Sequence, residues 1–256
     1  MRRALLLAAT VALTLASAAV GSPGKDAAYG KRLYGQYCIS CHGANGSGNV
    51  RTRPAGAGPL REQTSQSVAA PRLAGVGALS ADFYLRTGYM PLPRLGIQPR
   101  RTRLLLTGRQ IRALVAYVAS LGKGPPIPKP DPAKGSLSQG LHLFTDHCAG
   151  CHQVVAEGGY VTGAVPPPLE NATPTQVAEA VRIGPYVMPT FSKKAISDAQ
   201  LDSIVAYVEY AKHPDDPGGW ALGHVGPVPE GLVTWFFAGA ALLLVCMAIG
   251  TRFRRE

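Results

Sequence analysis

Cysteine is scarce in this 256-residue chain, and its placement excludes a disulfide scaffold. Four of the five cysteines lie in two copies of one motif, Cys38-Ile39-Ser40-Cys41-His42 and Cys148-Ala149-Gly150-Cys151-His152. The fifth, Cys246, stands alone in an apolar run near the C-terminus. With four cysteines committed to these motifs, no pair is left for a structural disulfide.

Acidic residues are also few, and the deficit is confined to the front of the chain. Residues 20–122 hold fourteen Lys and Arg against three Asp and Glu, whereas residues 123–213 hold seven against eight. A basic first part favours docking to an acidic partner or to anionic lipid headgroups. The alternative, which the sequence leaves open, is that the arginine-rich stretch 94–103 is a solvated loop.

The two Cys-x-x-Cys-His motifs predict covalent attachment of two c-type hemes. Two thiols three positions apart can add across both vinyl groups of one porphyrin, and the histidine that follows then lies beneath the iron as an axial ligand. A redox-active Cys-x-x-Cys pair or a zinc knuckle needs no histidine directly after the second cysteine. The residues assigned to attachment and ligation are Cys38, Cys41 and His42 for one heme and Cys148, Cys151 and His152 for the other.

The motifs belong to an internal repeat that predicts two tandem domains. Gly30 and Tyr34 precede the first motif by the same distances at which Gly140 and Phe144 precede the second. The first copy carries fourteen additional residues, roughly within positions 46–69. Further matches pair Pro71 with Pro167, Leu73 with Leu169, Arg86 with Arg182, and residues 114–118 with 204–208. We expect a domain at 27–122, a stiff proline-rich linker at 123–134 and a second domain at 135–213.

Each copy is predicted to be helical, which gives an all-α fold. One helix runs into the motif (27–37 and 137–147), and a middle helix starts near Ser80 or at Thr173-Pro174. A closing helix starts at Thr107 or Ser197, each followed three residues later by glutamine in a capping-box pattern. The apolar positions of the closing helices fall on one face: Ile111, Leu114, Val115, Val118, Leu201, Ile204, Val205 and Val208.

Each half resembles a class I cytochrome c domain, on the glycine and aromatic before the motif, a Pro-x-Leu loop, a Met-Pro pair and the closing helix. That family uses a methionine sulfur as the sixth iron ligand, and Met90 and Met188 are the methionines followed by proline. The resemblance also implies that the backbone carbonyl of Pro71 or Pro167 accepts a hydrogen bond from the second ring N–H of the ligating histidine. In the first half, Pro59 is an alternative candidate for this acceptor. Core packing by the methionines, or bis-histidine ligation, stays open. The spare histidines are His142, His147, His213 and His224.

Long apolar runs occur only at the two ends and predict export and anchoring. Residues 1–18 have a charged start, an apolar stretch and an Ala-Ser-Ala cleavage site, typical of a signal peptide; a retained anchor is the alternative. After a linker at 214–231, residues 232–251 form an uncharged run long enough to span a bilayer. The arginines of the tail, 252–256, place the C-terminus in the cytoplasm. We therefore expect a single-pass protein of the cell membrane with extracytoplasmic heme domains, a compartment that excludes nucleic acid as a partner.

The order of these parts resembles the diheme cytochrome c subunit of the cytochrome bcc complex of high-GC Gram-positive bacteria. The resemblance covers nearly the whole chain, and Gly226-Pro227-Val228-Pro229-Glu230-Gly231 before the span is its most specific part after the heme motifs. It implies a subunit of a menaquinol–cytochrome c reductase, an oxidoreductase and translocase, with a cytochrome b subunit and membrane lipid around it. Electrons would pass from a Rieske iron–sulfur protein through both hemes to a terminal heme–copper oxidase.

Two other functions are weighed against this one. A diheme relay subunit of another oxidase or membrane dehydrogenase would share the heme motifs, but such subunits can carry their anchor ahead of the hemes. A diheme peroxidase needs one heme with an open or displaceable ligand, and a methionine candidate for each heme argues against it. The chain by itself is expected to carry electrons and to have no substrate site.

Overall fold

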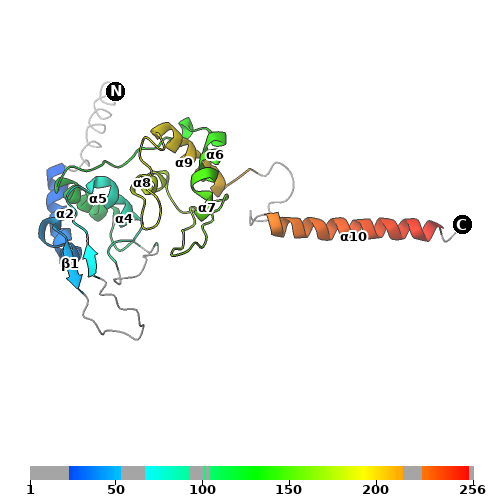
Figure 1. The fold of residues 1–256 in the computed structure, drawn as a ribbon, viewed down its shortest axis with the longest axis horizontal. Helices are drawn as coiled ribbons and strands as arrows, with labels where there is room; N and C mark the ends of the chain where they lie inside the picture. Colours follow the sequence, from blue (N-terminus) through cyan, green and yellow to red (C-terminus); the bar gives the residue numbers. More distant parts are fainter. Residues whose placement is uncertain (1–22, 53–66, 93–100, 102–103, 216–226, 254–256) are drawn as a thin grey trace, which may run out of the picture. The chain divides into compact units, whose positions relative to one another are not determined.

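The computed structural model describes residues 23–52, 67–92, 101, 104–215 and 227–253 (Figure 1). It divides into two units, residues 1–212 and 213–256. The predicted signal peptide, Pro59 and most of the arginine-rich stretch lie outside the described residues. The first unit contains both Cys-x-x-Cys-His motifs, and the second contains the apolar C-terminal run.

The first half of the repeat is mainly helical within the described residues. Its elements are α2 (Pro23–Tyr37), α3 (Ile39–His42), the 3-10 turn η1 (Ala44–Gly46), strands β1 (Asn49–Thr52) and β2 (Ser67–Ala70), α4 (Gly77–Arg86) and α5 (Gly108–Ser120). The strands pair antiparallel, with Asn49 opposite Ala70. They flank the additional segment of the first copy, where the sequence pattern did not predict strands.

The second half repeats the helices without the strands. It consists of the turn η2 (Pro132–Lys134), α6 (Leu137–His147), α7 (Ala149–His152), α8 (Pro174–Ile183) and α9 (Asp198–Lys212). The helix predicted at 137–147 and the start of α8 are confirmed, and the helical fold class with them. Helices α6 and α9 lie side by side in Figure 1 and pack against each other.

The closing helices begin where their capping residues predict. The Thr107 hydroxyl accepts a hydrogen bond from the Gln110 backbone N–H, and the Gln110 side chain accepts one from the Thr107 N–H. Ser197 and Gln200 make the same reciprocal pair ahead of α9. Each box satisfies two backbone donors that the first helical turn would otherwise leave unpaired. All eight apolar positions predicted to face the core are buried.

Helix α4 begins earlier than the sequence suggested, at Gly77 instead of near Ser80. The reason is a contact from the linker rather than a side-chain cap. The backbone N–H of Leu79 donates to the carbonyl of Pro125 at 3.2 Å. Gly77 has φ of +71°, and a Cβ there would meet the Pro125 carbonyl oxygen at 2.4 Å. Only glycine allows the linker to approach so closely.

The proline-rich linker is packed at both of its ends. Besides Pro125 on α4, Ile127 packs against the apolar core of the first half. At the other end the backbone N–H of Asp131 donates to the carboxylate of Asp202 in α9 at 2.8 Å. The linker is therefore held by each half instead of running freely between them.

The second unit is dominated by α10 (Pro227–Phe253). By length and composition its segment Gly231–Arg252 is a helix that could cross a membrane, and it is the single candidate among the described residues. It contains the predicted span at 232–251. Its large apolar side chains, such as Trp235 and Phe236, are exposed within this chain.

Candidate heme sites

Two helix crossings place the Cys-x-x-Cys-His motifs, and each depends on one glycine. A Cβ on Gly30 of α2 would lie 1.9 Å from the carbonyl oxygen of Ala113 in α5, and Gly140 of α6 stands in the same relation to Ser203 in α9. One turn later, aromatic rings close each crossing. The Tyr34 and Tyr117 centroids are 5.1 Å apart and those of Phe144 and Tyr207 5.2 Å apart. The first helix of each half is thus fixed just before its motif.

In each half a tyrosine hydroxyl holds the loop that follows the motif, but the tyrosine comes from a different helix in each half. In the first half the Tyr34 hydroxyl, from α2, donates to the carbonyl of Gly43 at 2.7 Å. In the second half the equivalent residue is Phe144, and the Tyr207 hydroxyl, from α9, donates to the carbonyl of Val154 at 2.6 Å. Each motif therefore has one phenol that ties the chain after its histidine to the helix crossing.

The histidine of each motif is held by a proline carbonyl. Nδ1 of His42 lies 2.9 Å from the carbonyl oxygen of Pro71, and Nδ1 of His152 lies 3.1 Å from that of Pro167. A carbonyl can only accept, so Nδ1 carries the proton and Nε2 is left as the free lone pair. Burial lowers the pKa of His152, against the raising effect of its bond to Pro167, which favours the neutral ring. A neutral imidazole with a fixed Nδ1–H is the form that ligates a metal.

The first cysteine of each motif lies at the core: Cys148 is buried in it, and Cys38 is partly buried and packs against it. Burial raises the pKa of the Cys38 thiol to about 11, and the neighbouring Cys41 adds to the shift. Cys148 has the same pKa for the same two reasons. A redox-active Cys-x-x-Cys pair has instead a lowered thiol pKa. The local environment thus agrees with attachment to an apolar cofactor rather than with thiol–disulfide exchange.

A cavity over the second motif brings its predicted site residues together. Its volume is about 1170 Å³ when the solvent at its mouth is included, and its walls are mostly apolar. Cys148, Cys151, His152 and Met188 all line it. Two thiols, a free imidazole nitrogen and a thioether around an apolar cavity form the donor set that a covalently attached heme requires.

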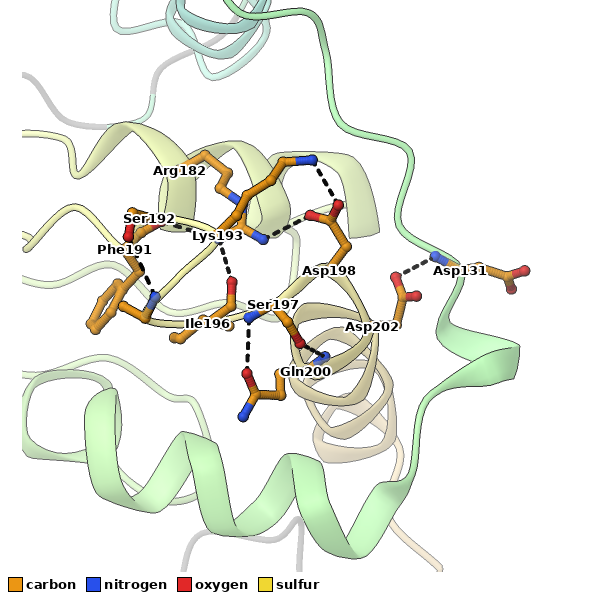
Figure 2. A network of polar contacts seen from close by, with 11 residues as sticks. Asp131, Arg182, Phe191, Ser192, Lys193, Ile196, Ser197, Asp198, Gln200 and Asp202 are labelled. Carbon is orange, nitrogen blue, oxygen red and sulfur yellow. Dashed lines mark hydrogen bonds and ion pairs between the residues drawn. The ribbon is translucent and has the colours of Figure 1, made fainter.

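The loop that carries Met188 is anchored by Arg182, at the end of α8 (Figure 2). Its guanidinium donates to the carbonyl oxygens of Phe191 at 3.1 Å and Ile196 at 2.7 Å, and to the carboxylate of Asp198 at 2.9 Å. Figure 2 shows that Arg182 and Lys193 both reach the carboxylate of Asp198, and the Arg182 side chain is 10% exposed against 73% for Lys193. Arg182 therefore fixes the return of the chain from Met188 to α9.

Met90 is placed by a different contact. Its backbone N–H donates to the carbonyl of Tyr84 at 3.0 Å, and its side chain is half-buried after the buried Tyr89. Within the part of the chain that the structure describes, the side chain of Arg86, the counterpart of Arg182, contacts its own helix instead of the methionine segment. It pairs with Asp82 one turn earlier in α4, with Nε 2.7 Å from the carboxylate.

The spare histidines before the second motif have separate positions. His142 is exposed, and its Nδ1 lies 3.8 Å from the carboxylate of Asp146. His147 lies at the cavity wall, its ring centroid 5.7 Å from that of Phe191. These contacts are those of a surface residue and of a residue packed on an aromatic ring.

The first half supplies part of the second cavity, which the sequence did not indicate. Phe83, Thr87, Tyr89 and Arg101 line it together with the residues of the second half. Arg101 donates to the side chain of Gln176 at 3.1 Å, and Gln176 in turn donates to the backbone carbonyl of Arg86 at 3.4 Å. These contacts join residues 75 and 90 positions apart in the chain, so no local sequence pattern could have predicted them.

The fold and the motif geometry define a chain built from c-type cytochrome domains. The family model described as "Cytochrome c" matches residues 27–122, and the model described as "Cytochrome C oxidase, cbb3-type, subunit III" matches residues 135–208. Domains of this class carry covalently bound heme c.

The relatives place the chain within one family. It is 33% identical to the cytochrome bc1 complex cytochrome c subunit of Corynebacterium diphtheriae, over 87% of this chain and 80% of that protein. It is also 33% identical to the subunit of that name from Mycobacterium tuberculosis, over 97% of this chain and 89% of the relative. A more distant relative, at 29% identity over 70% of this chain and 60% of its own length, is the cbb3-type cytochrome c oxidase subunit CcoP of an Azospirillum species. The chain belongs to the family of cytochrome bc1 complex cytochrome c subunits.

Proposed function

We propose that this chain is the diheme electron-transfer subunit of a menaquinol–cytochrome c reductase, passing electrons from a Rieske iron–sulfur protein through two c hemes to a terminal heme–copper oxidase. The observation that carries the proposal is the pair of motifs, each in its own helical half and each with its histidine bonded to a proline carbonyl. Membership of the cytochrome bc1 complex family supports the reductase rather than another host complex.

The residues assigned to the two hemes take the same roles in each half. The thiols of each motif would hold the porphyrin, and the histidine and methionine would ligate the iron. When bound, heme c supplies reversible one-electron transfer. The assigned residues are Cys38, Cys41, His42 and Met90 for the first heme and Cys148, Cys151, His152 and Met188 for the second.

The protein's contribution is to hold these ligands and to exclude competing chemistry. The bond from each histidine Nδ1 to a proline carbonyl keeps Nε2 free and fixes the plane of the ring. If the histidine and the methionine of each half both ligate the iron of a bound heme, that iron would have no position left for a substrate. The chain would then carry electrons, and the quinol chemistry and any proton translocation would belong to other subunits.

We place the heme domains outside the cytoplasm and the C-terminus inside. The signal-like start and the arginines that follow the apolar helix support the same orientation. The cytochrome b subunit, the Rieske subunit and a heme–copper oxidase are the proposed partners, with membrane lipid around α10.

A diheme relay subunit of an oxidase is the second candidate. It is favoured by the match of residues 135–208 to a cbb3-type oxidase model and by the CcoP relative. That relative is less similar and covers less of the chain than the cytochrome bc1 complex subunits. The two candidates predict different partners, which is what the first experiment should measure.

The test is gentle detergent extraction through a tag after Glu256, followed by mass spectrometry and a reduced-minus-oxidised spectrum. Co-purification of a cytochrome b, a Rieske protein and a heme–copper oxidase, with reduction of the c hemes by menaquinol, is the expected result. Recovery with an oxidase or a dehydrogenase alone would overturn the reductase assignment. The chain would then be a diheme relay subunit of that other complex. Rapid consumption of peroxide by the purified chain would point to a peroxidase instead.

A further inference from the structure

A buried acid lies where the two cytochrome halves meet. Glu179 of α8 is fully buried, and neither of its carboxylate oxygens has a hydrogen-bond partner among the described residues. Helix α8 packs here against α4 of the first half. A buried, unpartnered carboxylate is costly, because burial removes the water that would stabilise its charge.

The polar group that acts most on Glu179 is another acid. Asp82 of α4 is 3% exposed, and its two carboxylate oxygens share the single Nε–H of Arg86, at 2.8 and 2.7 Å from Nε. Burial raises the pKa of Glu179 to about 8, and the Asp82 carboxylate adds to the shift while the Arg86 guanidinium opposes it. Two facing carboxyl groups can form a hydrogen bond only when one of them carries a proton.

The other charged groups around α8 have partners of their own. Arg182 is engaged with Phe191, Ile196 and Asp198. On α9, which packs against α8, Lys212 donates to the carbonyl of Ala172 and to Glu209. Arg101 is bonded to Gln176. Glu179 is thus left with Asp82 and Arg86, both from the first half, as the charges that act on it.

We propose that Glu179 and Asp82 form a proton-binding site between the two halves, in which protonated Glu179 donates a hydrogen bond to the Asp82 carboxylate. While the proton is bound, the site holds one negative charge that Arg86 balances. When the proton is released to solvent, two buried negative charges face one guanidinium. The contact between α4 and α8 is then weakened by repulsion and by the cost of the second buried charge.

Residues beside this site form walls of the second cavity. The protonation state of Glu179 therefore affects the cavity in which the second heme would bind. Phe83 follows Asp82 and lines the cavity, as do Val177 and Ala180 on either side of Glu179. Tyr186 also spans the contact, with its ring centroid 6.3 Å from that of Tyr84 and 5.7 Å from that of Tyr89. Weaker docking at alkaline pH therefore opens a wall of this cavity. Its consequence for electron transfer rests on the proposed function, whereas the proton site itself does not.

The direct test is an infrared pH titration of the full-length protein, with hemes attached, in detergent. We expect the C=O stretch of one protonated carboxyl to disappear with a midpoint near pH 8. Glu179→Gln should remove this signal, and Glu170→Gln, which changes an exposed acid shortly before α8, should keep it. The absence of any carboxyl titrating in this range, or its persistence in Glu179→Gln, would overturn the proposal.

A second variant tests the same pairing without altering Glu179, in case Glu179→Gln does not fold. Asp82→Asn removes the like charge, so the midpoint of the titration should shift to lower pH, and an unchanged midpoint would contradict the pairing. Hydrogen exchange of the α4 and α8 amides, corrected for its intrinsic pH dependence, reports docking. It should increase above pH 8 in the unaltered chain and stay constant in Glu179→Gln. Neither readout depends on which complex the chain belongs to, so a failed reductase assignment would leave them unaffected.

Discussion

The sulfurs of Met90 and Met188 are the groups on which the proposed ligation depends, and leucine can replace each at similar volume. We expect Met188→Leu to remove the methionine–iron charge-transfer band of one heme and to lower its midpoint potential by tenths of a volt, because axial ligation sets the potential over a wide range. Met90→Leu should do the same to the other heme. A visible spectrum with a redox titration checks both.

Met247→Leu is the matched control for these variants. Met247 is an exposed methionine of α10, and its replacement should leave both potentials unchanged. If the intensity of the band is unchanged in Met188→Leu, the sixth ligand of the second heme is another residue. His147 is then the candidate, because it is the imidazole besides His152 in the cavity lining.

Gly30 shows how a single missing side chain sets a helix crossing. Its Cβ would overlap the carbonyl of Ala113, so Gly30→Ala must push α2 away from α5. We expect a loss of about 1–3 kcal/mol in the free energy of unfolding, the usual range for overpacking, or more if the crossing cannot adjust. Thermal or denaturant unfolding of the holoprotein measures it.

Gly35→Ala provides the comparison, since Gly35 lies in the same helix with nothing near its Cβ position. There alanine should be neutral or stabilising, because it lowers the entropy of the unfolded chain and favours the helix. Equal destabilisation by both variants would contradict the role of the crossing.

At the scale of elements, the segment from Met188 to α9 is held by Arg182. Arg182→Gln removes charged hydrogen bonds to two carbonyls and a carboxylate. We expect a loss of roughly 1.5–3 kcal/mol in stability, and loss of the methionine–iron band of the second heme at lower denaturant than in the parent protein. Denaturant titrations followed at that band and by circular dichroism separate the local from the global effect.

Lys193→Gln tests whether the ion pair with Asp198 alone explains the result. The Lys193 side chain is 73% exposed, against 10% for Arg182. Loss of this surface pair should change stability by less than about 1 kcal/mol and leave the band unaffected. A Lys193 effect as large as that of Arg182 would show that the carbonyl contacts contribute little.

Local signals predicted the elements well because local contacts build them. The capping pairs of Thr107 and Ser197 are formed within one helical turn, and the buried positions of α5 and α9 follow from helical periodicity. The start of α4 was misjudged for the opposite reason. It is capped by Pro125, a distant linker residue whose position no local pattern encodes. The short strands β1 and β2 were missed because each is paired with a strand at least fifteen residues away, which no local pattern encodes.

At the scale of the whole molecule, the sequence did not predict that Glu179 and Asp82 would interact. Each residue reads as an ordinary acid in its own helix, and only the packing of α4 against α8 makes them neighbours. The repeat did predict that both halves would position a histidine and a methionine. It could not predict that the first half would form a wall of the second cavity, because the repeat describes what the halves share and not how they pack.

The pH dependence of stability follows from the same buried acid. The pKa of Glu179 is raised from about 4.5 to about 8 on folding, so the folded protein holds a proton that the unfolded chain releases. Its contribution is fully present below pH 4.5 and is lost as the pH rises toward 8. Between these values we expect the free energy of unfolding to fall by about 1.4 kcal/mol per pH unit on account of this group.

Glu179→Gln should remove this slope. Denaturant unfolding of the holoprotein at several pH values, compared between the variant and the parent chain, measures the difference. The same slope in both would mean that Glu179 does not retain its proton in the folded protein.

The packed linker has a kinetic consequence. Because Pro125 is held on α4 and Asp131 on α9, the two cytochrome halves of one chain cannot diffuse apart. If each half holds a heme as proposed, an electron passing between them would take part in a first-order event, whose rate would not depend on how many copies of the protein the membrane holds. Carriers on separate chains would have to meet by collision, and their exchange would slow with dilution.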